Sequence, residues 1–284
     1  MLYSKTCLIK FYGAGGKMNV DFGYKHLTGL VWLFSLIAVM LLVFLFIKRR
    51  WKLGESFDRA LIRYTCYFMW ASDIIRSIRL INFDDFGPVG YYPLWMGPFH
   101  ICSMALYAYL IIGSKHPGKL AKFVTPFGYS VMLVVTSIIL AIPASSGILG
   151  SVENWSFCFD NLLPYQSWIY HGCLAFVPLY MALSGFYRPK WSDILRSTAV
   201  LFVVAACAQS LNFILDGSGA DFMMLRYGNG NPFAFLLTDA PWLYYILLAT
   251  VSIAGISLVT AVTIGARSLS EKIRAKKDAE IIEA

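Results

Sequence analysis

Charged residues are scarce in this chain. Of its 284 residues, only 14% are Asp, Glu, Lys or Arg, whereas typical soluble domains carry about 25%. Hydrophobic residues make up 58%, and the mean hydropathy is +0.62. This shortage of charge excludes an ordinary soluble globular domain, and we interpret the chain as an integral membrane protein.

Several familiar motifs are also missing. The six cysteines include no CxxC spacing, which argues against a zinc site or a dithiol redox pair. We expect no cofactor and no metal. His26, His100, His171 and Asp73 are eligible metal ligands, which leaves a metal site open as an alternative, but their spacing gives no positive sign of one. No continuous apolar core precedes Leu27, so the N-terminal stretch does not resemble a cleaved signal peptide, and Met18 is an alternative start.

Long apolar runs are what the chain has in place of charge, and each is long enough to cross about 30 Å of hydrocarbon. We predict an all-α integral membrane protein whose single polytopic domain (27–266) is a seven-transmembrane-helix bundle. An N-terminal extracytoplasmic segment (1–26) precedes it and a cytoplasmic tail (267–284) follows. The predicted spans are 27–47, 60–81, 92–113, 123–144, 163–183, 194–215 and 241–266.

Basic residues favour one side of the predicted bundle. Lys and Arg collect after the first, third and fifth spans and in the tail, whereas the other connections have almost none. This bias predicts a multi-pass protein of the cell membrane with its N-terminus out and its C-terminus in. Four lysines in the first 26 residues oppose the assignment. We attribute the net charge of +8 to topology, with membrane lipids rather than nucleic acid as partners.

Polar residues of the predicted spans collect toward the outer side. Such residues are costly in a bilayer and usually face a cavity or a partner. Asp73 and Arg76 are three residues apart, so they can neutralise each other on one helical face. We predict an outward-opening pocket whose substrate-binding residues are His26, Asp73, Arg76, Asn212, Asp216 and Arg226. Polar packing between helices is the alternative, and the 217–240 connection is either a lid or an ordered interfacial loop.

A cysteine and two histidines on the outer side suggest nucleophilic chemistry. A thiol becomes a nucleophile when a nearby base or cation favours the thiolate. In a regular helix His100 and Cys102 would point about 200° apart, so His171 from another helix would be the better base. Pro98 could distort that helix, which keeps His100 as a second candidate. Ordinary packing is the alternative for Cys102, and a helix-crossing hydrogen bond is the alternative for each histidine.

Short motifs in three parts of the chain resemble the YwaF-like family of integral membrane proteins. They are PFHIC, WIYHG and LNFILDGSGADFMMLRYGNGNPFAFLLTDAPWLYY, and the likeness covers residues 22–266. The turn DGSGADFMMLR departs from the usual pattern of the family. An animal branch of the family resembles phospholipid acyltransferases that use a cysteine acyl-thioester and a histidine. By motif these correspond to Cys102 and His171, with His100 as a further candidate.

The resemblance implies a lipid acyltransferase or acyl-ester hydrolase with a lysophospholipid or acyl lipid as substrate. The alternative is a non-enzymatic receptor, sensor or transport component that uses the same pocket. The last predicted span has no lysine, which excludes a retinal Schiff base at that place, and no internal symmetry suggests a transporter. A third hypothesis is an accessory protein whose polar residues serve helix packing alone.

Overall fold

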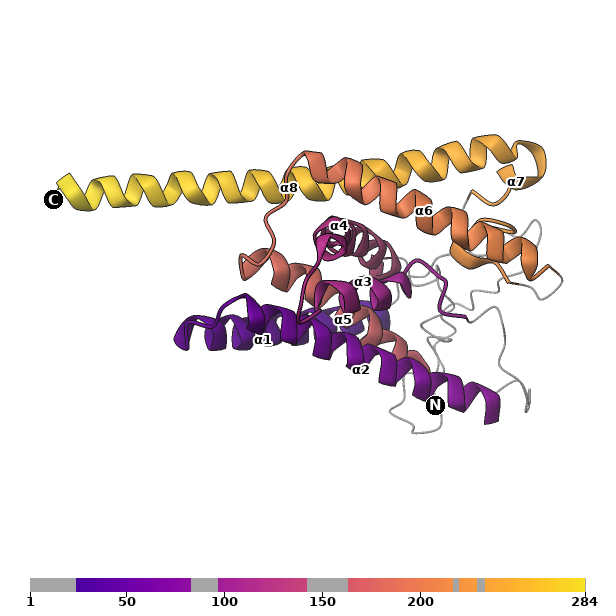
Figure 1. Ribbon diagram of the computed structural model, residues 1–284, viewed down its shortest axis with the longest axis horizontal. Helices are drawn as coiled ribbons and strands as arrows, with labels where there is room; N and C mark the ends of the chain where they lie inside the picture. The colour runs from indigo at the N-terminus through magenta and orange to yellow at the C-terminus, as the bar shows by residue number, and fades with distance from the viewer. Residues whose placement is uncertain (1–23, 83–96, 142–162, 217–219, 229–232, 284) are drawn as a thin grey trace.

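The protein is mainly helical in the part that the computed structural model describes, namely residues 24–82, 97–141, 163–216, 220–228 and 233–283 (Figure 1). No β-strand occurs in these ranges, which confirms the all-α class. The elements in chain order are α1 (Tyr24–Arg50), α2 (Glu55–Asn82), α3 (Met104–Ile112), α4 (Lys119–Ala141), α5 (Leu163–Leu183), α6 (Ser192–Ile214), the 3-10 helix η4 (Phe222–Met224), α7 (Leu236–Asp239) and α8 (Pro241–Glu283).

Four of these helices are long and apolar enough to cross a membrane. Their candidate spans are Leu30–Arg50 in α1, Lys119–Leu140 in α4, Ser192–Ile214 in α6 and Pro241–Lys276 in α8. By contrast, α2 has 28 residues but mixes charged side chains with apolar ones, and α5 carries polar residues in its N-terminal half. The described residues therefore support a membrane protein with four candidate spans, and the predicted number of seven and the orientation stay predictions.

The helix found in the third predicted span, 92–113, is shorter than expected. Residues 97–103 form successive turns, and α3 begins only at Met104. Its 9 residues rise about 14 Å, less than half of the hydrocarbon thickness. Pro98, which has no backbone donor to continue a helix, lies in these turns. The predicted helix is wrong over this stretch, so the angular argument for His100 and Cys102 does not apply; residues 92–96 lie outside the described residues.

Helix α5 lies at the centre of one helical layer. It packs against α1, α2 and α4, and most of its side chains from Ser167 to Met181 are buried. Figure 1 shows α5 between α4 and the pair formed by α1 and α2. A helix that is covered on most sides can carry polar groups that bond within the protein, which accounts for its modest apolarity.

Helices α6 and α8 form a second layer. They pack against each other and both pack against α4, which joins the two layers. Helix α8 is one continuous helix of 43 residues, so the predicted last span at 241–266 runs without a break into the predicted tail. The C-terminal part of α8 extends beyond the rest of the molecule (Figure 1).

A buried ion pair fixes the end of the bundle at which α1 ends and α2 begins. Lys48 Nζ donates to Asp58 Oδ2 at 2.7 Å and to the Ser184 carbonyl at 2.9 Å. Asp58, which is 2% exposed, also accepts a hydrogen bond from the Tyr180 hydroxyl at 2.6 Å. This Lys48–Asp58 network joins α1, α2 and α5, and both carboxylate oxygens of Asp58 are bonded.

The end of α3 lies at the same end of the bundle. Arg59 Nη1 donates to the Ile112 carbonyl, and Arg63 Nη1 donates to the Gly113 carbonyl at 2.9 Å. These carbonyls end a helix and have no intrahelical donor, so the arginines of α2 satisfy them. Consequently the α1–α2, α3–α4 and α5–α6 connections, which are rich in basic residues, share one end.

Candidate functional site

Polar groups from three segments meet at the opposite end, between α2, α5 and the turns before α3. The Tyr170 hydroxyl of α5 donates to the Cys102 carbonyl at 3.4 Å. The Arg76 guanidinium of α2 is close enough to Cys102, Tyr170 and His171 to act on each of them electrostatically. We call Asp73, Arg76, Cys102, Tyr170 and His171 the Cys102–His171 cluster.

Asp73 and Arg76 form the ion pair that their spacing predicts. Arg76 Nη2 lies 2.6 Å from Asp73 Oδ1, and Asp73 is 7% exposed. Arg76 Nε is also buried, but it has no hydrogen-bond partner among the described residues. The pair therefore balances its own charge and leaves one buried donor unused, which is uncommon because buried polar atoms are normally bonded.

His171 has one bonded and one unbonded ring nitrogen. Nδ1 lies 2.7 Å from the Ser167 carbonyl, and since a carbonyl only accepts, Nδ1 carries the hydrogen. Nε2 of the neutral ring is then a bare acceptor. His171 is only 4% exposed, and Nε2 has no hydrogen-bond partner in the described part of the chain. An unsatisfied buried acceptor costs about 1–3 kcal/mol, so this nitrogen is held at an energetic cost.

Four cysteines lie in the described ranges, and Cys102 differs from the other three. Cys66 is buried and donates to the Leu106 carbonyl at 3.1 Å, and Cys173 is buried in the core. Cys207 is exposed on α6. Only Cys102 among these four combines partial exposure with a nearby guanidinium. The chemistry of a reactive thiol depends on access and on a nearby cation or base, and Cys102 has both.

His100 has different neighbours. Its ring packs against that of Phe222 with 5.4 Å between centroids, and Phe99 packs against the same ring at 5.3 Å. Phe222 belongs to η4, which packs against α6. The structure thus places His100 toward α6 and η4, whereas it places His171 in the electrostatic environment that Cys102 shares.

Three predicted substrate-binding residues come together around η4. Asn212 is fully buried, and its side chain bonds both the N–H of Phe222 at 2.7 Å and the Phe222 carbonyl at 3.0 Å. Arg226 Nη1 donates to the Asn212 carbonyl at 2.6 Å, and Nη2 pairs with Asp216 Oδ1. These bonds are of the kind expected if the polar residues serve packing, which is the alternative to a substrate pocket. The role of Asn212, Asp216 and Arg226 in substrate binding therefore stays a prediction.

The remaining sequence predictions about the site find less evidence in the structure. His26 lies in α1, but the placement of its side chain is outside the described residues. The connections 83–96 and 142–162, which would border an outward-opening pocket, are also outside them. In the described ranges no group of three or more His, Cys, Asp or Glu is placed to hold a metal ion. The sequence analysis did not identify Ser167 and Tyr170 as part of the site. Their positions could have indicated them, because Ser167 lies one helical turn before His171 and Tyr170 directly precedes it.

The apolar helices and the polar cluster define a helical integral membrane protein, and comparison with known proteins identifies the family. The model of the TMEM164 family matches residues 22–260, which is most of the chain. The chain belongs to this family of membrane proteins. No curated protein and no solved structure matches it. The finer resemblance to YwaF-like proteins stays a prediction.

Proposed function

We propose that this protein is a membrane-embedded lipid acyltransferase or acyl-ester hydrolase of the YwaF-like type, with Cys102 as nucleophile and His171 as base. In this proposal the chain crosses the cell membrane seven times with its N-terminus outside, and the Cys102–His171 cluster lies on the extracytoplasmic side. The basic connections at the opposite end of the bundle support this orientation.

One observation carries the proposal: His171 presents a buried Nε2 that has no hydrogen-bond partner among the described residues, in the same cluster as the partly exposed Cys102. A histidine that served only to join helices would use this nitrogen in a hydrogen bond. A general base needs the opposite arrangement, with one nitrogen holding the tautomer and the other free to accept a proton. The Ser167 carbonyl holds the tautomer in this way.

The proposed chemistry proceeds in two transfers. His171 Nε2 accepts the thiol proton while Cys102 Sγ attacks the acyl carbonyl of a lipid ester, so an S–C bond forms. The ester C–O bond then breaks, and the lysolipid oxygen leaves with the proton. In the second transfer a hydroxyl of a lysophospholipid, or water, attacks the thioester carbonyl, so an O–C bond forms and the S–C bond breaks. The proton of the attacking hydroxyl passes through His171 Nε2 to the leaving sulfur. The Arg76 cation and its unused N–H are suited to an anionic headgroup or to the developing oxyanion.

The test is covalent trapping of the acyl group. Wild-type protein in proteoliposomes that contain an alkyne-tagged acyl phospholipid should acquire the tag in a form that hydroxylamine releases. Cys102→Ala should abolish the labelling and leave expression and thermal stability nearly unchanged. Cys207→Ala removes an exposed cysteine outside the cluster and is the matched control. Persistent labelling of Cys102→Ala would disprove the assignment of the nucleophile.

A second variant tests the base. His171→Gln keeps a side chain that can bond the Ser167 carbonyl but has no basic nitrogen, so the rate of labelling should fall by about 10²–10⁴-fold. Labelling at the wild-type rate would remove His171 from the mechanism. Lipid binding by the wild-type protein without any covalent adduct would favour the non-enzymatic alternative instead.

A further inference from the structure

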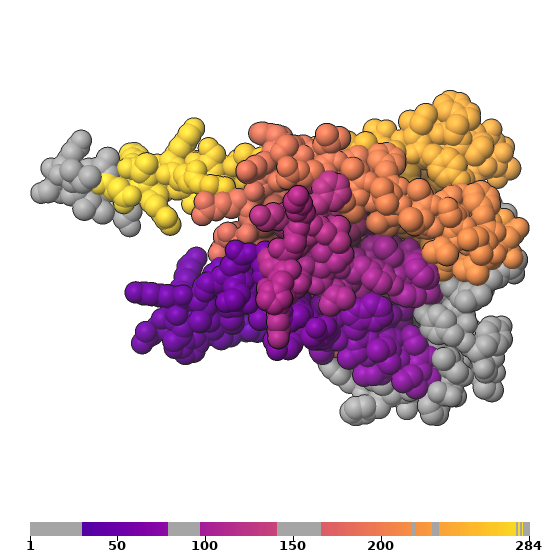
Figure 2. All heavy atoms as spheres, in the orientation of Figure 1, coloured from indigo at the N-terminus to yellow at the C-terminus, as the bar shows by residue number. Residues whose placement is uncertain are grey.

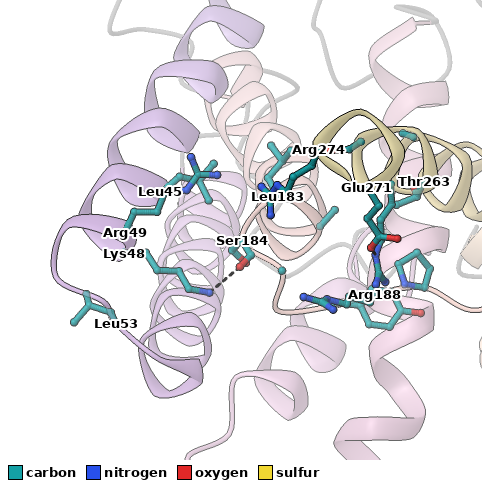
Figure 3. A pocket seen from close by; sticks show the side chains of 17 residues that line it. Leu45, Lys48, Arg49, Leu53, Leu183, Ser184, Arg188, Thr263, Glu271 and Arg274 are labelled. Carbon is teal, nitrogen blue, oxygen red and sulfur yellow. Dashed lines mark hydrogen bonds and ion pairs between the residues drawn. The ribbon is translucent and has the colours of Figure 1, made fainter. Parts of the chain in front are cut away.

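The basic end of the molecule contains a cavity of about 600 Å³, which is far from the Cys102–His171 cluster. It lies between α1, the connection from α5 to α6, and α8, as Figure 3 shows. Figure 2 shows the surface hollowed between the C-terminal parts of α1 (indigo) and α8 (yellow). The volume falls within the range of about 300–1,000 Å³ that is typical of small-molecule sites.

Positive charge dominates the lining of this basic cavity. Five cations and one carboxylate line it, and they are Lys48, Arg49, Arg188, Arg267, Arg274 and Glu271. The charges come from three segments that are far apart in the sequence. Positive-inside topology explains why bases lie at this end, but it does not require them to converge on one hollow.

Two of the cations already have anionic partners. Lys48 pairs with the buried Asp58 at 2.7 Å, and Arg267 Nε pairs with Glu271 at 2.7 Å. The guanidinium groups of Arg49, Arg188 and Arg274 have no ion-pair partner within the described ranges. Three uncompensated guanidinium groups therefore share one cavity, and a guanidinium matches the geometry of a phosphate, which it can bind through two parallel hydrogen bonds.

The connection that carries Arg188 is held in place by Asp193. The Asp193 carboxylate accepts hydrogen bonds from the Tyr187 hydroxyl at 2.8 Å and from the N–H of Lys190 at 2.9 Å. Burial, together with this carboxylate, raises the pKa of Tyr187, so its hydroxyl stays protonated and remains a donor. Gly185 takes a φ of +74°, which a side chain would disfavour. Arg188 is thus presented by an ordered turn.

The position of the cavity relative to the candidate spans suits a lipid. The spans in α1 and α8 both extend to its lining residues, and Leu45 and Leu183 contribute apolar walls beside the cations. Phe46 of α1 and Val262 of α8, which directly adjoin the lining residues Leu45 and Thr263 in the chain, expose apolar side chains. A ligand with an anionic head and apolar chains would meet both kinds of surface.

We propose that this basic cavity binds a phosphate group through Arg49, Arg188 and Arg274. The phosphate belongs either to the headgroup of an anionic lipid in the adjoining leaflet or to a soluble phosphate. Both sources supply a phosphate whose oxygens accept hydrogen bonds, and its negative charge would offset part of the positive charge that lines the cavity. The site is independent of the acyl-transfer chemistry proposed for Cys102.

Thermal unfolding of the detergent-solubilised full chain tests the site. Dioctanoyl phosphatidic acid and inorganic phosphate are titrated separately, and dioctanoyl phosphatidylcholine, which has no net charge, is the reference. The triple variant Arg49→Gln, Arg188→Gln, Arg274→Gln should raise the anion concentration for half-maximal stabilisation by about tenfold or more. The control Arg50→Gln, Lys119→Gln, Lys272→Gln removes the same charge from exposed residues outside the cavity and should change it less than about twofold.

The outcomes separate the two sources. Stabilisation by phosphatidic acid alone supports a lipid headgroup, and stabilisation by both anions supports a soluble phosphate. The proposal would be overturned if the triple variant and the control required the same anion concentration for half-maximal stabilisation. It would also be overturned if neither anion stabilised the wild type. If the triple variant does not fold, the single variant Arg274→Gln, on the exposed part of α8, replaces it. It should raise the anion concentration for half-maximal stabilisation by about threefold.

Discussion

The two buried ion pairs at opposite ends of the bundle are alike in chemistry and differ in how completely they are bonded. In the Lys48–Asp58 network both carboxylate oxygens have donors, and the ammonium also bonds a backbone carbonyl. In the Asp73–Arg76 pair the Arg76 Nε–H finds no partner in the described part of the chain, and the same holds for Nε2 of the neighbouring His171. A saturated network stabilises the fold, whereas spare buried atoms are available to a substrate. The comparison predicts a structural role for the Lys48–Asp58 network, and it agrees with the acyl-transfer chemistry proposed for the Cys102–His171 cluster.

The strongest test of this difference is Asp58→Ala. The substitution leaves the largely buried Lys48 ammonium without its counter-charge, so the free energy of unfolding should fall by about 3–5 kcal/mol. Asp73→Ala should lower it less, because Arg76 is 25% exposed and can be hydrated. Denaturant unfolding in detergent measures both variants. Equal losses would remove the distinction between the two ends.

A smaller effect is expected where α2 and α3 meet at the saturated end. A Cβ on Gly113 would lie 2.8 Å from the Arg63 backbone nitrogen and 2.9 Å from its Cα, which is too close for any side chain. Gly113→Ala should therefore lower the free energy of unfolding by about 1–3 kcal/mol, since backbone cannot move aside cheaply. Gly118→Ala has open space around its Cβ and is the matched control. Matching stabilities for the two variants would contradict the close contact.

The smallest change in stability, with a large change in activity, is expected at the other end. Replacing both Asp73 and Arg76 by apolar residues, as Asp73→Leu with Arg76→Met, should alter the free energy of unfolding by at most about 1.5 kcal/mol. The same double variant should lose acyl labelling of Cys102, because the charge beside the thiol is gone. Undiminished labelling would support the alternative in which these residues serve helix packing alone.

Much of the helical framework could be predicted from the sequence, because composition and local spacing determine it. The run 163–183 coincides with α5, and the runs 27–47, 60–81 and 241–266 fall within α1, α2 and α8. The runs 123–144 and 194–215 begin within α4 and α6, whereas in the run 92–113 a helix occurs only from Met104 to Ile112. The ion pair of Asp73 and Arg76 follows from a spacing of three in one helix, and the structure confirms it. Each of these features depends on residues within one helix.

Features that depend on contacts between distant segments could not be predicted. The partner of Lys48 is Asp58 on the next helix, and nothing in the sequence separates this lysine from the other bases around it. The basic cavity needs α1 and α8 on either side of the turn after α5. The turns at 97–103 could have been anticipated at Pro98, but an apolar run favours a helix until the tertiary structure shows otherwise.

The sheltered position of α5 bears on how the chain is made. A segment with histidine and glutamine in its first half gains little from partitioning alone into lipid. Its packing partners α1, α2 and α4 all precede it in the chain, so they emerge from the ribosome before α5 does. The order of synthesis therefore supplies α5 with a protein surface to dock against at the moment it emerges.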